Sequence, residues 1–222
     1  MNITISIVYD LIFIAVVLWV ALRGKHNGLL AGIAGLVGTV VGIFGAVWAA
    51  RTWAGPLYTD YLGVGIGNKV NQAIAASGGD FAAAISGMEI LPESIRTALA
   101  ELAQDATGDI APRVITALEP LVLPLVQALI FLVACLVIKA VFALAVRVLR
   151  GLNHLPLLGT LNQMLGFAFG FVTGLVDCWL LSIALWVVAS LSGGGISFLT
   201  ESVLNGSYLY RIFATYNPFL AQ

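Results

Sequence analysis

Three ionisable side chains lie inside long apolar stretches of this sequence. They are Asp10, Lys139 and Asp177. A charge at the centre of a bilayer costs about 2.5 to 3.5 kcal/mol on the insertion scale, so each of these groups needs a partner, a route to water or a function. An acid and a base at similar depth can form an ion pair or pass protons or ions along a pathway. The chemistry open to these residues is therefore charge pairing or ion movement within a membrane.

The depth of each charge follows from its distance to the end of its helix. At a rise of 1.5 Å per residue, Asp10 and Asp177 lie roughly 20 Å, and Lys139 roughly 12 Å, from the cytoplasmic ends of their helices. Asp177 and Lys139 can therefore form a structural ion pair, act as a proton or ion relay, or reach water independently by snorkelling. Asp10 lies nearer the outer surface, where a solvated helix start or an N-cap is the simplest interpretation.

No pattern typical of an enzyme or a metal site accompanies these charges. The sequence contains no HExxH, GxSxG or GxxxxGK[ST] motif and no cluster of Cys and His at metal-ligand spacing. His26 and His154 lie beside predicted turns, and Cys135 and Cys178 lie in apolar stretches, where a free Cys behaves as a small hydrophobic residue. We therefore expect no catalytic residues, no cofactor and no metal.

The composition identifies the environment of the chain. Of its 222 residues, 60% are apolar and 9% are charged, whereas about 25% of the residues of a soluble domain are charged. The mean hydropathy is +1.03. The net charge of −1 provides no basic surface for nucleic acid. The composition therefore excludes a water-soluble globule and a nucleic-acid partner, and predicts the lipid bilayer as the principal partner.

Apolar stretches of sufficient length to cross a membrane, each with at most one charged residue before its basic end, occur four times. A bilayer core of about 30 Å needs about 20 helical residues. The sequence therefore predicts an all-α, polytopic membrane protein with four transmembrane helices, a helical extracytoplasmic insertion and a C-terminal amphipathic segment. The helices are placed at residues 3–22, 29–50, 121–146 and 161–190.

These helices divide the chain into four predicted segments. Two of the segments are transmembrane hairpins, one is an acidic insertion outside the cytoplasm, and the last lies at the membrane interface, where its many aromatic rings suit the headgroup level. The first hairpin is residues 1–50, the insertion 51–120, the second hairpin 121–192 and the interfacial segment 193–222.

The acidic insertion holds eight acidic and four basic residues. Its glycine-rich stretches, residues 63–72 and 76–80, are interpreted as turns. Further on, apolar residues at spacings of three and four predict a short amphipathic helix at 95–106.

Basic residues beside the two short turns set the orientation, because Lys and Arg are retained on the cytoplasmic side. Arg23 and Lys25 occupy the first turn, and Arg147 and Arg150 end the third helix. Both turns are therefore predicted to be cytoplasmic, which places the insertion and both termini outside.

Glycines recur at helical spacing in the second and fourth predicted spans. Such stripes allow a second backbone to approach closely, and close packing drives helix association in lipid. They indicate packing within a four-helix bundle, which we favour, or a seam for self-association between copies. The glycines are Gly28, Gly32, Gly35, Gly38, Gly42 and Gly45 in the second span and Gly166, Gly170 and Gly174 in the fourth.

The first hairpin carries Asp10 near the start of its first helix, followed by Arg23, Gly24 and Gly28 around the turn. Its second helix is rich in glycine. This arrangement resembles the first motif of the colicin V production protein family.

The second half of the chain resembles the same family. Residues 161–174 are similar to its Asn/Asp-x-x-x-Gly-x-x-x-Gly segment, and Ser207 with Asn217 and Pro218 is similar to its closing residues. The resemblance covers residues 8–50 and 121–220, and the acidic insertion is where the chain departs from the shortest members.

The resemblance implies an integral protein of the bacterial cytoplasmic (inner) membrane that is needed for colicin V production and linked to envelope physiology. Together with the residues, it predicts a non-enzymatic accessory or structural protein in the production or export of this toxin, a bacteriocin, and in envelope maintenance. Its acidic insertion would meet an envelope or export protein as partner. The alternative is a small oligomeric channel or transporter that uses Asp177 and Lys139.

Overall fold

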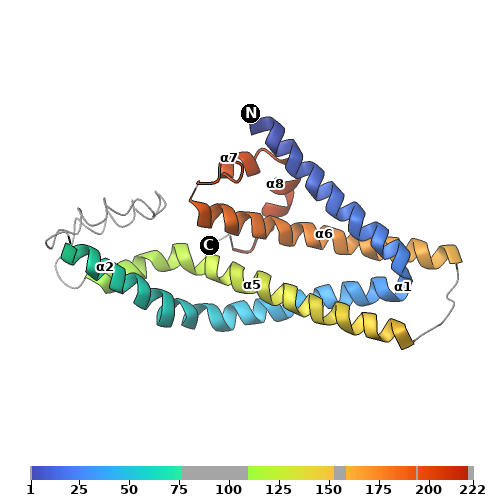
Figure 1. Ribbon diagram of the computed structural model, residues 1–222, viewed down its shortest axis with the longest axis horizontal. Helices are drawn as coiled ribbons and strands as arrows, with labels where there is room; N and C mark the ends of the chain where they lie inside the picture. Colours follow the sequence, from blue (N-terminus) through green and yellow to red (C-terminus); the bar gives the residue numbers. More distant parts are fainter. Residues whose placement is uncertain (1, 77–109, 153–158, 194, 220–222) are drawn as a thin grey trace.

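The computed structural model describes residues 2–76, 110–152, 159–193 and 195–219. Every regular element in these ranges is a helix, and Figure 1 shows that the long helices run side by side. The elements are α1 (Asn2–Leu57), the π-helix η1 (Tyr58–Gly63), α2 (Val64–Ala76), α5 (Ile110–Leu152), α6 (Gly159–Ser192), α7 (Glu201–Leu204) and α8 (Tyr208–Ala214).

The helix α1 consists of two arms that meet at Gly28. We call residues 2–27 the first arm and residues 29–57 the second arm. Gly28 has φ of 77° and ψ of 178°, a backbone conformation that a residue with a Cβ rarely adopts. At this glycine the chain reverses direction, and the two arms diverge from it (Figure 1). A single residue therefore makes the turn that the sequence predicts between residues 22 and 29.

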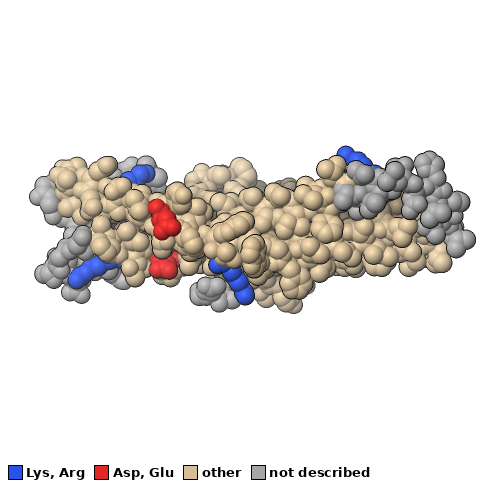
Figure 2. Space-filling model, turned by 90° about the horizontal axis from the view of Figure 1, so that it is seen from below, with Lys and Arg blue, Asp and Glu red and all other residues tan. Residues whose placement is uncertain are grey.

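The long helices present an apolar surface to their surroundings. In the described part of the chain, three helices are long and apolar enough to cross a membrane, and they lie within Ile5–Ala76, Ala111–Leu144 and Gly159–Ser192. The side chains of Phe44 and Leu136 are 74% and 65% exposed. Most of the surface in Figure 2 carries no charged side chain. An apolar surface of this extent is typical of contact with lipid.

The prediction of turns at residues 63–72 is wrong, because η1 continues directly into α2 without a loop. Two of the glycines here, Gly63 and Gly67, serve a helix contact instead, whereas no atom lies within 4 Å of a Cβ on Gly65. A Cβ on Gly67 would lie 3.4 Å from Cδ1 of Ile115 in α5, and a Cβ on Gly63 would lie 3.3 Å from Cγ2 of the same residue. Residues 77–80 and the helix predicted at 95–106 lie outside the described residues.

The helix α5 begins at Ile110, several turns before the predicted start at residue 121. Pro120 and Pro124 both lie inside it, although a proline contributes no N–H to the helix. The early turns pack against the chain that follows α1, where the Tyr58 hydroxyl donates a hydrogen bond of 2.6 Å to the carbonyl of Ile115. This packing favours the continuation of α5 into residues 110–120, which the sequence analysis assigned to the insertion.

Among the described residues, two apolar clusters hold the helices together, and α6 belongs to both. One joins α6 to the second arm and α5, with Phe131 and Ile183 fully buried in it. The other joins α6 to the first arm and the C-terminal helices, with Phe13 and Leu204 buried. The helix α6 therefore links the two halves of the bundle.

The C-terminal helices α7 and α8 lie between the first arm and α6 (Figure 1). The ring of Phe213 stacks on Phe13 with their centroids 5.5 Å apart. Beyond α8, the indole N–H of Trp179 donates a hydrogen bond of 3.0 Å to the carbonyl of Tyr216. The aromatic residues that the sequence analysis assigned to the membrane interface therefore include several that pack against the long helices.

Candidate functional site

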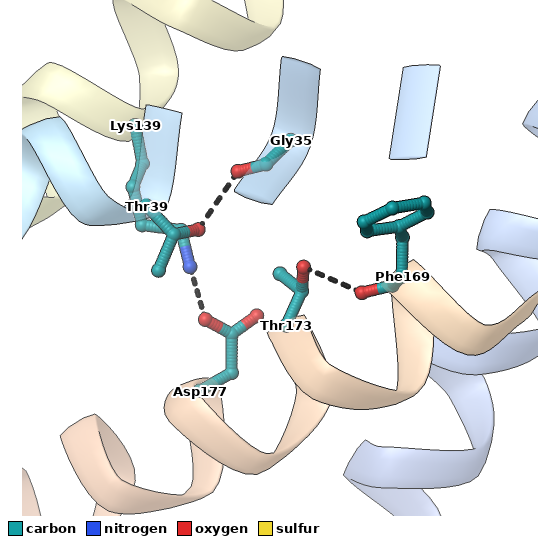
Figure 3. A network of polar contacts seen from close by, with 6 residues as sticks. All are labelled: Gly35, Thr39, Lys139, Phe169, Thr173 and Asp177. Atoms are coloured by element: carbon teal, nitrogen blue, oxygen red, sulfur yellow. Dashed lines mark hydrogen bonds and ion pairs between the residues drawn. The ribbon is translucent and has the colours of Figure 1, made fainter. Parts of the chain in front are cut away.

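Lys139 of α5 and Asp177 of α6 form an ion pair (Figure 3). The ammonium of Lys139 donates a hydrogen bond to Oδ1 of Asp177. Both side chains are partly buried, with exposed fractions of 23% and 27%. Of the three intramembrane charges that the sequence singles out, these two are therefore brought together.

Two hydroxyl groups lie beside the pair, as Figure 3 shows. The hydroxyl of Thr39 donates a hydrogen bond of 3.0 Å to the carbonyl of Gly35, and the hydroxyl of Thr173 donates one of 2.9 Å to the carbonyl of Phe169. Each hydroxyl therefore bonds to the backbone of its own helix one turn earlier, as is common for threonine in membrane helices.

The ion pair lies at one end of a cavity of about 330 Å³. Both arms of α1, together with α5 and α6, line this cavity. Arg23 of the first arm and Arg147 of α5 also line it, so the lining carries three cationic side chains and one carboxylate. At 1.5 Å per helical residue, Lys139 and Arg147 are about 12 Å apart along α5. The cavity therefore extends from the ion pair toward the end of the bundle at which Gly28 lies.

Asp10 lies apart from this cavity and binds the start of α8. Its carboxylate accepts hydrogen bonds from the hydroxyl of Ser207 at 2.6 Å and from the backbone N–H groups of Leu209 at 2.8 Å and Tyr208 at 3.3 Å. Ser207 in turn accepts a hydrogen bond of 3.1 Å from the N–H of Tyr210. Asp10 and Ser207 together therefore satisfy the first N–H groups of α8.

The sequence analysis interprets Asp10 as a solvated helix start or an N-cap. Its carboxylate does cap a helix, but this helix lies at the other end of the sequence. Two neighbours of Asp10 also bind the C-terminal segment. The hydroxyl of Ser6 donates a hydrogen bond of 2.8 Å to the carbonyl of Val203, and the hydroxyl of Tyr9 donates one of 2.7 Å to the carbonyl of Phe198. The first arm therefore holds the C-terminal segment through three polar side chains.

The glycines of α6 lie against the first arm. A Cβ on Gly170 would be 2.7 Å from the carbonyl oxygen of Val20, and a Cβ on Gly174 would be 3.0 Å from Cα of Val17. Gly166 faces Gly24 at similarly close range. These backbones approach so closely that a side chain would have to displace one of them.

The glycines of the second arm contact two different helices. Gly38, Gly42 and Gly45 face α5, where a Cβ on Gly38 would be 2.8 Å from Cβ of Phe142. Gly32 faces α6, since its Cβ would be 2.9 Å from Cβ of Phe169. Gly35 differs from the others, because it lines the cavity and no atom lies within 4 Å of the position of its Cβ. Apart from Gly35, these glycines have neighbours within their own chain.

Asn162, near the start of α6, holds the turn at Gly28. The backbone N–H of Leu29, at the start of the second arm, donates a hydrogen bond of 2.6 Å to Oδ1 of Asn162. A Cβ on Gly28 would lie 2.6 Å from Nδ2 of the same side chain. The sequence analysis did not select Asn162 as a site residue, and its place before the glycines of α6 was the available signal.

Comparison with protein-family models matches residues 9–217 to the family described as colicin V production protein. The matched stretch contains the ion pair, the cavity and the contacts of Asp10. Comparison with curated proteins and with solved structures gave no match. Since the family model covers nearly the whole chain, this protein belongs to the colicin V production protein family.

Proposed function

We propose that this protein is a non-enzymatic accessory factor of the bacterial cytoplasmic membrane that supports the production or export of colicin V and the maintenance of the envelope. The family match over residues 9–217 carries the proposal. The packing of the chain supports it, because the glycines of α6 bring backbone against backbone within the bundle. A bundle joined in this way is suited to a structural role in lipid.

Within this proposal, the chain crosses the membrane four times. The reversal at Gly28 supports two crossings by α1, since each arm is longer than the roughly 20 residues that a bilayer core needs. The helices α5 and α6 supply the other two. Such an even number of crossings places both termini on the same side.

The orientation proposed for the chain has both termini outside the cytoplasm. Arg23 and Arg147 line the same cavity, which supports the placement of both basic turns at one end of the bundle, on the cytoplasmic side. Fusions to alkaline phosphatase and to green fluorescent protein test this orientation. After residue 222 we expect active phosphatase and no fluorescence, whereas fusions after residue 152 give the reverse. The opposite pattern at both positions would invert the orientation.

The acidic insertion is proposed to bind a protein of the envelope or of the export machinery. Its charge, with eight acidic and four basic residues between 51 and 120, favours a partner with a basic surface. Two acids of the insertion that the structure describes, Asp60 and Glu119, are exposed. They lie near the two ends of the insertion, where it joins the membrane-spanning helices.

Complementation tests the role directly. The chain is expressed in a strain that produces colicin V and lacks its own family member, and the zone of growth inhibition around colonies is measured. We expect the chain to restore the zone, and a variant with neutral residues at the insertion's acids to insert into the membrane without restoring it. A variant with Asp and Glu exchanged serves as the charge-matched control. Failure of the wild-type chain to restore the zone would contradict the proposed role.

The ion pair favours the accessory role over the channel considered in the sequence analysis. Lys139 and Asp177 are engaged with each other at one end of the cavity, and a paired acid and base at this depth fit a structural link between α5 and α6.

A further inference from the structure

The cavity described above carries an excess of positive charge. Its lining includes Arg23, Lys139 and Arg147 but only one acid, Asp177. Because Lys139 is paired with that acid, the two guanidinium groups account for the excess. In the described part of the chain, neither Arg23 nor Arg147 forms a salt bridge. Two cations that line one cavity favour the binding of an anion there.

Apart from Asn27, Thr39 and Thr173, the rest of the lining is apolar or small. Val20, Ala31, Ala34 and Phe142 contribute to it, and the open position at Gly35 leaves part of the volume unfilled. A volume of about 330 Å³ is at the lower end of the range for small-molecule sites, roughly 300 to 1,000 Å³. The cavity therefore has room for a compact anionic group and for part of an apolar chain attached to it.

The cavity also reaches the outer surface of the bundle. Trp19 lines it and is nevertheless 71% exposed. In a membrane, the surface beside Trp19 faces lipid, so a lipid molecule can enter from the side without crossing water. Indole rings favour the level of the headgroups, and basic pockets between transmembrane helices are known to take phosphate-bearing lipid headgroups.

We infer that this cavity binds the phosphate group of an anionic phospholipid between Arg23 and Arg147. A guanidinium group suits the site, since it donates two parallel hydrogen bonds to phosphate oxygens. In the orientation proposed above, the lipid comes from the cytoplasmic leaflet. The inference requires membrane insertion but is independent of the role in colicin V production, so failure of complementation leaves it unaffected.

Native mass spectrometry of the full chain in detergent tests the site. Phosphatidylglycerol and phosphatidylcholine are added separately, and the fraction of protein that retains each lipid is measured. We expect selective retention of phosphatidylglycerol. The variants Arg23→Gln and Arg147→Gln should each weaken this retention about fivefold, the effect of one basic residue near an anionic lipid surface. Equal retention of the two lipids by the wild-type chain would overturn the inference.

Gly35 provides a variant that blocks the cavity without removing a charge. No atom lies within 4 Å of a Cβ at Gly35, so Gly35→Leu projects its side chain into the cavity without displacing backbone. Gly55 lies in the same arm of α1 and is equally open, so Gly55→Leu is the matched control. We expect Gly35→Leu to lose phosphatidylglycerol and Gly55→Leu to retain it. Equal retention by both variants would place the lipid elsewhere and contradict the inference.

Inorganic phosphate distinguishes a lipid from a soluble anion as the occupant. We expect millimolar phosphate to leave the retention of phosphatidylglycerol unchanged, because the acyl chains add affinity that free phosphate lacks. If phosphate displaces the lipid from the wild-type chain, or raises its Tm in wild type but not in Gly35→Leu, the site belongs to a soluble anion and the lipid assignment is wrong.

Discussion

Ser207 donates a hydrogen bond of 2.6 Å to the carboxylate of Asp10, which joins the start of the α8 segment to the first arm of α1. The same carboxylate accepts the N–H groups of Leu209 and Tyr208. An anion at a helix N-terminus is favoured by the helix dipole, and a backbone N–H without a partner is costly in an apolar environment. Asp10 therefore serves to attach the C-terminal segment.

The first prediction concerns this attachment. Asp10→Ala should loosen α8, because it removes an acceptor from two N–H groups and one hydroxyl, whereas Asp10→Asn retains one oxygen acceptor. The expected destabilisation is about 1 to 3 kcal/mol for Asp10→Ala and smaller for Asp10→Asn. Limited trypsin digestion measures it, since α8 contains the exposed Arg211. Asp60→Ala, which removes an exposed acid, is the control, and equal cleavage of all variants would contradict the prediction.

The second prediction concerns the ion pair. Lys139→Ala and Asp177→Asn each leave the partner without its opposite charge, so each should lower the Tm in detergent. The double variant leaves no unpaired charge. We therefore expect its loss of stability to be smaller than the sum of the two single losses, by about 1 kcal/mol or more. Simple additivity in this double-mutant cycle would show that the two side chains are not coupled.

The third prediction compares two glycines. Gly170→Ala places a methyl group 2.7 Å from the carbonyl oxygen of Val20, so α6 and the first arm must separate, at a cost of about 1 to 3 kcal/mol. Gly35→Ala meets no atom within 4 Å and should be neutral or stabilising by up to about 1 kcal/mol, since alanine favours helix. Thermal unfolding in the same detergent measures both. A similar loss in the two variants would argue against the close contact at Gly170.

The fourth prediction concerns the turn at Gly28. Asn162→Leu removes the acceptor of the Leu29 N–H and should cost about 1 to 3 kcal/mol. Asn162→Asp retains an oxygen at that position and should cost less. Hydrogen exchange of the Leu29 amide is the specific measurement, because it should accelerate in Asn162→Leu and remain slow in Asn162→Asp. Unchanged exchange in Asn162→Leu would exclude the hydrogen bond.

The fifth prediction concerns alkaline pH. Burial, with a smaller contribution from the negative charge of Glu201, raises the pKa of Tyr210 to about 12. Because the pKa is higher in the folded state than the usual value near 10, the neutral phenol stabilises the fold fully below pH 10, and this contribution is lost between pH 10 and 12. Absorbance of tyrosinate at 295 nm should show a titration near pH 12 that Tyr210→Phe removes. Titration of every tyrosine near pH 10 would contradict the burial.

The helical class and the long apolar helices could be predicted from the sequence because hydropathy is a local property. The contact of Lys139 with Asp177 was open to prediction for a related reason: charges inside apolar helices are few, and their depth follows from their position along the chain. Local pattern and depth therefore placed the ion pair among three alternatives, and the contact itself is seen only in the structure.

The other contacts could not be predicted in this way. Neither the bond from Ser207 to Asp10 nor the bond from Leu29 to Asn162 leaves a periodic pattern, because each joins residues far apart in the sequence. The sequence was misleading at Gly63 and Gly67, because glycine occurs both in turns and at close contacts between helices. The sequence alone does not distinguish these two cases. Only the position of Ile115 distinguishes the two cases.

The attachment of α8 to the first arm has a consequence for biosynthesis. A chain is made from its N-terminus, so Asp10 emerges early, whereas Ser207, Tyr208 and Leu209 are translated after every long helix. Until translation is nearly finished, the space between the first arm and α6 lacks the segment that fills it. Assembly of this half of the bundle is therefore post-translational. A chain that is truncated before residue 207 has an unpaired carboxylate at Asp10 and an apolar gap beside it, and both are exposed to the proteases that remove incomplete membrane proteins.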